Sequence, residues 1–165
     1  MRRLHIDCIL QLMHIAIIMQ YSNLPFYWIN HLSSVSRRRL SKRFEEAGHK
    51  ITAEEWAVLL VLWQKGPQAP SALSEATIKD RTTVTRLIDG LVRKALVERR
   101  ENATDRRRSD IILTPYGEGL KPELVPFAME IIAQATAGVP KEDMETTLRT
   151  LRAFAENLSN SDKAQ

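Results

Sequence analysis

Threonine and arginine side chains gather in two short stretches of the sequence, and both stretches suit contact with a nucleic acid. The first runs from Arg81 to Arg86, and the second runs from Asp105 to Arg108. Short hydroxyl side chains can meet base edges or thymine methyl groups, and arginine can bind guanine or a phosphate. The residues predicted to contact DNA are Arg81, Thr82, Thr83, Thr85, Arg86, Asp105, Arg106, Arg107 and Arg108.

The excess of positive charge lies in the same part of the chain. The 165 residues carry a net charge of +4, and the window 76–115 holds ten basic and six acidic residues, which accounts for that excess. A localised positive surface is what binding to a polyanion requires. A solvated basic face is the alternative interpretation, and charge alone does not separate the two.

The first stretch is expected on a helix, which is an element that fits the major groove of DNA. Residues 70–77 predict a short helix with Ala69 as a poor N-terminal cap, and a turn at 78–80 leads to a second helix over 81–95. The apolar residues of this second helix recur at helical spacing, so its threonines and arginines should face outward. The predicted buried stripe is Val84, Leu87, Ile88, Leu91 and Val92.

The second stretch lies at the tip of a predicted β-hairpin. Residues 96–101 and 110–114 have the composition of strands, and the polar segment 102–109 between them is turn-like. Two short helices followed by a basic hairpin predict a winged helix-turn-helix. Arginines at the tip could enter a narrow minor groove, and Asp105 could hold the Arg107 guanidinium in an extended position. A solvated charged turn is the alternative for this tip.

Longer helices are predicted before the helix pair. The segment 24–47 places apolar residues on one stripe and arginines on the opposite side, and Gly48 suits its end. Thr52 and Glu55 form a capping box that begins a buried helix, which stops at Gly66.

Further helices are predicted after the hairpin. Thr114 and Pro115 open a helix that Pro122 and Pro126 should kink or break. A last helix covers 141–158, and the residues after it read as a disordered tail.

The stretch from Ile51 to Gly117 resembles the MarR (multiple antibiotic resistance regulator) family of bacterial transcription regulators. Ala95 departs from the pattern, because a glycine commonly ends the second helix there. The matching residues of that helix are Thr83, Val84, Thr85, Arg86, Ile88, Asp89 and Leu91. The matching residues that follow are Leu96, Val97, Arg99, Asp105, Arg107, Ile111, Leu113, Thr114 and Gly117.

The resemblance implies a mainly α fold with a small β-hairpin wing, in which N- and C-terminal helices form a homodimer. Residues 24–50 and 115–158 would be the dimerisation helices, 51–114 the DNA-binding lobe and 159–165 the tail. Such proteins place the second helix in the major groove of double-stranded DNA and the wing arginine, here Arg107, in the minor groove. Many are repressors that a small phenolic or aromatic ligand releases from a palindromic operator.

A binding site for such an effector is predicted where the dimer helices meet the DNA-binding lobe. The candidate residues are Tyr27, Trp28, His31 and Trp56, and aromatic core packing is the alternative interpretation. For residues 1–23 we expect an extra helix at the dimer interface, although a signal-like segment and a misassigned start at Met19 are alternatives. Cys8 is expected to be a plain thiol, and an intersubunit disulfide is the alternative.

Enzyme chemistry is not indicated by the sequence. No nucleophile elbow, phosphate loop or paired-carboxylate signature is present, and the four histidines lack metal-ligand spacing. We therefore expect no catalytic residue, no metal and no cofactor. One cysteine fits the reducing cytoplasm, and no segment predicts a membrane span. The alternative function is a winged-helix module that binds another protein and has no operator of its own.

Overall fold

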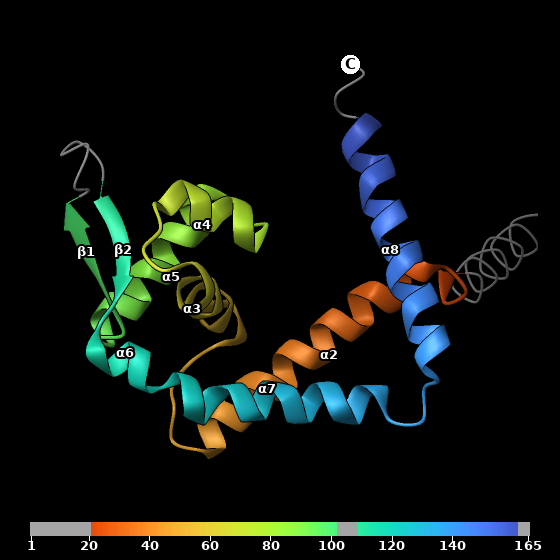
Figure 1. The fold of residues 1–165 in the computed structure, drawn as a ribbon, viewed down its shortest axis with the longest axis horizontal. Coiled ribbons are helices and arrows are strands. Elements are labelled where there is room, and N and C mark those ends of the chain that lie inside the picture. Colours follow the sequence, from red (N-terminus) through yellow and green to blue (C-terminus); the bar gives the residue numbers. More distant parts are fainter. Residues whose placement is uncertain (1–20, 102–108, 162–165) are drawn as a thin grey trace, which may run out of the picture. The chain divides into compact units, whose positions relative to one another are not determined.

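The computed structural model describes residues 21–101 and 109–161, and Figure 1 shows it as a ribbon. Helices make up most of it, and one two-stranded sheet completes it, so the predicted mainly α fold with a β-hairpin is confirmed. Internal contacts divide the chain into two units, one reaching Ala128 and one beginning at Met129. The elements are α2 (Pro25–Glu46), α3 (Ala53–Lys65), α4 (Pro70–Thr77), α5 (Arg81–Arg93), β1 (Val97–Glu101), β2 (Ser109–Leu113), α6 (Pro115–Gly119), α7 (Lys121–Thr136) and α8 (Lys141–Ser161).

Helix α3 is defined at both ends by the residues that the sequence indicated. The Thr52 hydroxyl accepts a hydrogen bond from the Glu55 amide at 3.1 Å, and the Glu55 carboxylate accepts one from the Thr52 amide at 2.9 Å. This capping box satisfies two amides that a helix start otherwise leaves unpaired. Gly66 ends the helix with a φ of 71°, a conformation that glycine adopts without strain.

Helices α4 and α5 form the helix-turn-helix. Helix α4 begins at Pro70, and its cap residue Ala69 makes no side-chain hydrogen bond, as predicted. Ile78 ends α4 in the left-handed region, with a φ of 53°. Helix α5 ends at Arg93, two residues before the predicted end, because Ala95 adopts a φ of 55° and turns the chain toward β1.

The wing is an antiparallel hairpin, and β2 also pairs with a residue outside the hairpin. Val97 pairs with Leu113 and Glu101 pairs with Ser109, and the tip between the strands lies outside the described residues. Gln68, between α3 and α4, exchanges two backbone hydrogen bonds with Ile111 of β2, at 3.1 and 2.8 Å. The wing is therefore joined to the helix-turn-helix through main-chain atoms.

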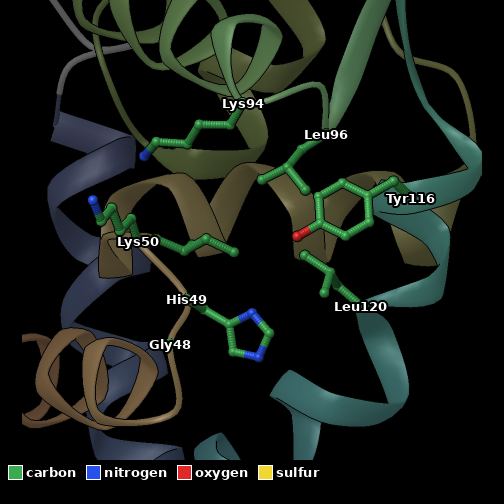
Figure 2. A pocket seen from close by; sticks show the side chains of 8 residues that line it. Gly48, His49, Lys50, Lys94, Leu96, Tyr116 and Leu120 are labelled. Carbon is green, nitrogen blue, oxygen red and sulfur yellow. The ribbon is translucent and has the colours of Figure 1, made fainter.

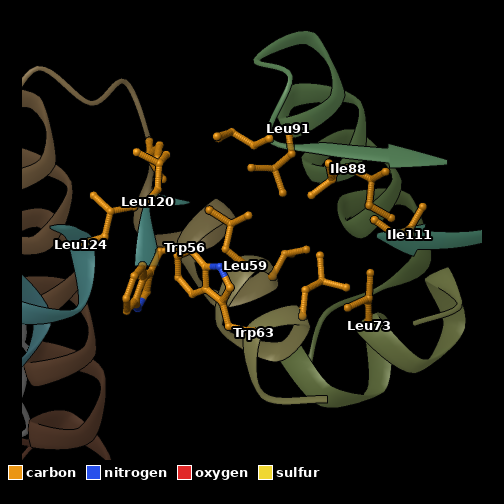
Figure 3. Close-up of a cluster of buried hydrophobic side chains, with 14 of the residues drawn as sticks. Trp56, Leu59, Trp63, Leu73, Ile88, Leu91, Ile111, Leu120 and Leu124 are labelled. Carbon is orange, nitrogen blue, oxygen red and sulfur yellow. The ribbon is translucent and has the colours of Figure 1, made fainter. Parts of the chain in front are cut away.

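One hydrophobic core holds α3, α4, α5 and the hairpin together, as Figure 3 shows. Leu59 of α3, Leu73 of α4, Ile88 of α5 and Ile111 of β2 are each fully buried. The predicted stripe of α5 is correct for its other members but wrong for Val92, which is 39% exposed. Val92 lies in the last turn of α5, at the edge of the buried face, so it falls outside the core.

A tight contact after the wing holds the start of α6 against the connection between α5 and β1. Thr114 caps α6 by accepting a hydrogen bond from the Gly117 amide, and its hydroxyl donates to the carbonyl oxygen of Ala95 at 2.7 Å. A Cβ atom on Gly117 would lie 2.0 Å from the Leu96 carbonyl oxygen, so only glycine fits there. The predicted break near Pro122 is confirmed at Leu120, whereas Pro126 lies inside α7.

The unit that begins at Met129 contains the end of α7 and all of α8. Helix α8 runs to Ser161, so residues 159–161 continue the helix where the sequence predicted a disordered tail, and residues 162–165 lie outside the described residues. Serine and asparagine are modest helix formers, so they weaken a sequence-based helix prediction. They do not break an established helix as a proline would, because each keeps its backbone N–H. Its apolar residues include Leu148, Leu151 and Leu158, which are 47%, 37% and 61% exposed in the single chain.

Candidate nucleic-acid interface

Helix α5 presents one apolar face to the core and one polar face to solvent. Val84, Ile88 and Leu91 are fully buried, which fixes the rotation of the helix about its axis. The predicted contact residues Arg81, Thr82, Thr85 and Arg86 are exposed, and Thr83 is half-buried. The structure therefore brings these five predicted residues together on the first turns of one helix.

Asp80 organises the start of α5. Its carboxylate accepts a hydrogen bond from the Thr83 amide at 2.8 Å and another from the Thr83 hydroxyl at 2.7 Å. The hydrogen bonds from the Thr83 hydroxyl and amide hold the pKa of Asp80 below its ordinary value, so its carboxylate is charged at neutral pH. The sequence analysis missed Asp80, although an aspartate directly before a helix is a recognised cap.

The hydroxyl and guanidinium groups on this face differ in how free they are to bind a ligand. Thr83 already donates to Asp80, and the Thr85 hydroxyl donates to the Arg81 carbonyl oxygen at 2.8 Å. Within residues 21–101 and 109–161, no partner is found for the side chains of Thr82 and Arg86. These two side chains, like the guanidinium of Arg81, can therefore turn to a base edge without breaking an internal hydrogen bond.

A salt bridge fixes the wing to α5. The guanidinium of Arg99, on β1, lies 2.8 Å from the carboxylate of Asp89, on α5, and each side chain is a little under half exposed. On the neighbouring residue of β1, Arg100 forms an exposed pair with Glu98. The sequence placed Asp89 and Arg99 in the family pattern but did not pair them, because a contact between elements cannot be read from spacing within one element.

A second salt bridge anchors the C-terminal end of α5 to the start of α3. The ammonium group of Lys94 lies 2.6 Å from both carboxylate oxygens of Glu55, whose side chain is 7% exposed. This carboxylate belongs to the capping box of α3, and a Cβ atom on Gly90 would lie 2.8 Å from it. Gly90, which weakens helix propensity, therefore makes room for the ion pair.

The remaining predicted DNA contacts, Asp105, Arg106, Arg107 and Arg108, lie outside the described residues. The strands on either side of them are described, and their pairing runs from Val97–Leu113 to Glu101–Ser109. The segment that carries these four residues is therefore joined at both of its ends to a hairpin that is fixed to α5.

The four residues predicted to line an effector pocket do not come together within this chain. Tyr27, Trp28 and His31 pack ring against ring at the start of α2, with centroid distances of 5.3 to 5.9 Å. Trp56 is 7% exposed and packs on Phe44 near the other end of α2, with centroids 5.4 Å apart. Because a helix rises about 1.5 Å per residue, the two groups lie about 25 Å apart along α2. Core packing explains Trp56.

Residues 51–109 match the sequence model of the MarR family. The winged helix-turn-helix of this chain is a MarR-family domain. The match spans the capping box of α3, the helix-turn-helix and the first strand of the wing with the start of the second. Glu55, Gly90 and the Asp89–Arg99 pair, which hold the elements in place, therefore lie inside the MarR-family domain.

Individual relatives and solved structures extend the similarity beyond the MarR-family domain. The transcriptional repressor YetL of Bacillus subtilis is 25% identical over 115 residues, which are 68% of this chain and 69% of YetL. A solved structure of Bordetella bronchiseptica BpsR, whose DNA binding is regulated by 6-hydroxynicotinic acid, matches with a TM-score of 0.73 and 24% sequence identity. The match covers 82% of this chain and 95% of BpsR. The structure of reduced AbfR bound to DNA has a TM-score of 0.66 and 20% identity and covers 85% of this chain and 95% of AbfR. These structures share the fold of the chain described here.

Neither a metal site nor a membrane span is found in the described part of the chain. Residues 21–101 and 109–161 contain no cluster of three or more His, Cys, Asp or Glu side chains that could hold a metal ion. None of the helices in that part of the chain combines the length and apolar character needed to cross a bilayer. The polar face of α5 and the strands attached to it by the Asp89–Arg99 salt bridge form the candidate functional site.

Proposed function

We propose that this chain is a DNA-binding transcription regulator that acts as a homodimer on a two-fold symmetric operator. The observation that carries the proposal is the exposed face of α5, on which Thr82 and Arg86 have no partner among the described residues while the opposite face is locked in the core. Two relatives support the same function, because YetL is a repressor and AbfR is seen bound to DNA. Binding to chromosomal DNA would place the protein in the cytoplasm.

In this proposal α5 enters the major groove and the wing tip enters the adjacent minor groove. Thr82, Thr85 and Arg86 contact bases or phosphates, and Thr83 chiefly shapes the start of α5 through Asp80. The Asp89–Arg99 pair sets the position of the wing, which would carry Arg106, Arg107 and Arg108 toward the minor groove. Two copies related by a two-fold axis would read half-sites about 10 base pairs apart.

A small effector would release the DNA by favouring a spacing of the two α5 helices that no longer matches the half-sites. In BpsR, DNA binding is regulated by 6-hydroxynicotinic acid, which supports a small aromatic effector here. Repression, rather than activation, is the mode that the relative YetL favours.

Fluorescence anisotropy with a duplex from upstream of the chain's own gene tests the proposal. We expect Arg86→Ala to weaken binding more than about tenfold, because it removes a charged contact to guanine or phosphate. Lys42→Ala is the matched control, since Lys42 is an exposed cation on α2 that pairs with Glu46. Circular dichroism checks that both variants fold.

The slope of log affinity against log salt concentration separates the proposal from a module that binds another protein. We expect a steep negative slope of about −0.9 for each phosphate neutralised. A folded dimer that ignores duplex DNA in dilute buffer, or an Arg86→Ala variant that binds as tightly as the native chain, would overturn the proposal.

A further inference from the structure

Strand β1 of the wing has one edge that β2 does not occupy, and we call the side of residues 97–101 that faces away from β2 the β1 edge. Figure 1 shows β1 on the outer side of the hairpin, and residues 98–101 are all exposed. We propose that the β1 edge is a self-association surface, at which two copies of the chain pair their β1 strands in antiparallel register and join their wings into one sheet.

The backbone of β1 offers hydrogen-bonding groups along this edge. Ile111 of β2 exchanges both of its backbone hydrogen bonds with Gln68, at 3.1 and 2.8 Å, so its N–H and C=O groups point away from β1. Arg99 lies opposite Ile111 in the register, and it therefore belongs to a pair without hydrogen bonds between the two strands. Because this pattern alternates along a strand, the N–H and C=O groups of Val97, Arg99 and Glu101 all point outward at the β1 edge.

The start of β1 is already fixed within the single chain. The Leu96 carbonyl oxygen accepts a hydrogen bond from the Thr114 amide at 3.1 Å, and Leu96 is 2% exposed. Figure 2 shows the Leu96 side chain on the wall of a pocket that it shares with Tyr116 and Leu120. The salt bridge to α5 holds the middle of the strand. A strand that is already ordered loses little conformational entropy on pairing, which favours association.

The charges on β1 are complementary to those of a second β1 in one antiparallel register. When Arg99 lies opposite the Arg99 of the second copy, Glu98 of each copy lies opposite Arg100 of the other. These positions carry no hydrogen bonds between the copies, so their side chains would lie closest together. In the single chain Glu98 and Arg100 pair at 2.9 Å, and their side chains are 51% and 67% exposed. Pairing would join both carboxylates and both guanidinium groups into one network.

Charged side chains on an edge strand ordinarily protect it from pairing with other strands. Residues 98–101 are four consecutive charged residues, and a strand with another charge pattern would leave them without opposite charges. A second antiparallel β1 is the exception, because it supplies the opposite charge at 98 and 100. The two Arg99 side chains oppose pairing, but each has Asp89 at 2.8 Å as a counter-charge. The edge is five residues long, so we expect weak association that depends on a high local concentration.

Antiparallel pairing would set the two wings in opposite directions, and this consequence rests on the proposed function. Strand β1 runs toward the segment that joins it to β2, so the two joining segments would leave the paired sheet at opposite ends. Wings that point in opposite directions cannot enter neighbouring minor grooves on the same side of one duplex. Self-association would therefore link copies that are bound to separate duplexes or to distant sites on one DNA molecule.

Sedimentation equilibrium of the full-length chain over a range of concentrations tests the self-association without DNA. We expect a reversible association step beyond the homodimer, and Arg100→Glu should weaken it about tenfold or more, because two-fold symmetry makes both charge pairs repulsive. Adding Glu98→Arg to Arg100→Glu restores opposite charges in the same register and should return the association constant to within about threefold of the native value. The matched control is Lys65→Glu, since Lys65 is an exposed lysine at the end of α3 and its reversal changes the net charge equally.

A second variant tests the backbone hydrogen bonds at the β1 edge. Glu101→Pro removes an outward N–H group and leaves the hydrogen bonds between β1 and β2 in place, as proline does on an edge strand. It should weaken the association step, whereas Glu101→Gln, which removes the same charge, should weaken it less. Circular dichroism checks that every variant folds.

Capture of a fluorescent operator duplex by an immobilised one tests the link between DNA molecules. The native chain should hold the fluorescent duplex on the surface, and Arg100→Glu should lose most of it at a concentration that still saturates a single duplex. A native chain without the association step, or a combined variant as weak as Arg100→Glu alone, would overturn the β1 edge as an interface. Association without capture would overturn the link between duplexes alone, and a chain that never binds DNA would overturn the proposed function while the sedimentation result still stands.

Discussion

Two residues hold left-handed backbone conformations, one in the turn of the helix-turn-helix and one directly after its second helix. Ile78 ends α4 with a φ of 53°, and Ala95 follows α5 with a φ of 55°. The left-handed region costs roughly 1–2 kcal/mol for a residue with a Cβ atom, and more for a β-branched residue such as isoleucine. The turn into α5 and the turn into the wing therefore both store strain, on either side of the helix that we propose reads DNA.

Glycine at either position should raise the free energy of unfolding. We expect a gain of about 0.5–1 kcal/mol for Ile78→Gly and for Ala95→Gly, because relief of the strain exceeds the added entropy of the unfolded chain. Ile78 is 93% exposed, so its removal costs little packing. Urea denaturation followed by circular dichroism measures the change.

The control for these variants is Ala47→Gly, at the end of α2, where φ is −84°. Glycine has no strain to relieve there, so the free energy of unfolding should fall slightly. A loss of stability in both Ile78→Gly and Ala95→Gly would show that the left-handed residues are not strained.

Single residues were predictable from the sequence where a local rule applied to them. Thr52, Glu55, Gly66 and Thr114 each occupy the cap position that their type and spacing indicated. Ala95 was marked as a departure from the glycine common in the family, and its φ gives the reason for that preference. The second role of Glu55, as the partner of Lys94, was not predictable, because 39 residues separate the two in the chain.

At the scale of elements, the wing depends on α5 for its position. The Asp89–Arg99 salt bridge joins the two at 2.8 Å. We expect Arg99→Gln to reduce the affinity for operator DNA by about three- to tenfold, since a loosened wing pays more entropy on binding. The free energy of unfolding should change by less than about 1 kcal/mol, because the pair is close to half exposed.

Arg100→Gln is a closely matched comparison for this test. Arg100 follows Arg99 on β1, carries the same charge and pairs with Glu98 of its own strand at 2.9 Å. Both variants lose one positive charge, so a difference between them in anisotropy measurements reports the contact with α5. Equal losses of affinity would show that Arg99 acts through its charge and does not position the wing.

Elements were predicted well where an apolar pattern and a cap agreed. Helices α3 and α4 and both strands lie within one residue of their predicted bounds. The predictions failed at the edge of a buried helix face and at a helix end. Val92 lies at the edge of the apolar stripe of α5 and is exposed, and α8 continues through polar residues past Leu158. Periodicity defines the centre of a buried face, whereas the rim and the helix end depend on which neighbours are present.

The four residues predicted to bind an effector do not meet within one chain, for a related reason. Aromatic residues on α2 and α3 were grouped by chemical type, but Tyr27 lies in the first turn of α2, whereas Trp56 packs on Phe44 near the other end of that 22-residue helix. The sequence shows which residues share a face of one helix, and it does not show which end of that helix a second element contacts.

At the scale of the whole molecule, each of the two units leaves apolar side chains uncovered. Trp28 and Leu32 of α2 are each 57% exposed in the single chain, and Met129 of α7 is 57% exposed. Helix α8 adds a stripe in which Leu148, Leu151 and Leu158 recur at helical spacing. A soluble monomer rarely exposes so much apolar surface along its helices, which supports a second copy of the chain as the cover.

Leu148→Glu should therefore dissociate the dimer and leave the protomer folded. Leu148 is 47% exposed in the single chain, so a charge there disturbs little within the protomer, but it would be buried against the second copy. Analytical ultracentrifugation should find a monomer. Affinity for a palindromic operator should fall more than about a hundredfold, because the second half-site is no longer bound within the same complex.

Thr146→Glu provides the control, since Thr146 is exposed and lies on the opposite side of α8 from Leu148. It adds the same negative charge to the same helix, so it should remain dimeric and keep native affinity for the operator. Binding to an isolated half-site should be weak and equal in all three proteins, because each protomer keeps its own α5 and wing. If Leu148→Glu stays dimeric, the exposed stripe of α8 is not the surface that joins the two copies. If it becomes monomeric and still binds the palindrome at full strength, the two-fold arrangement contributes nothing to recognition.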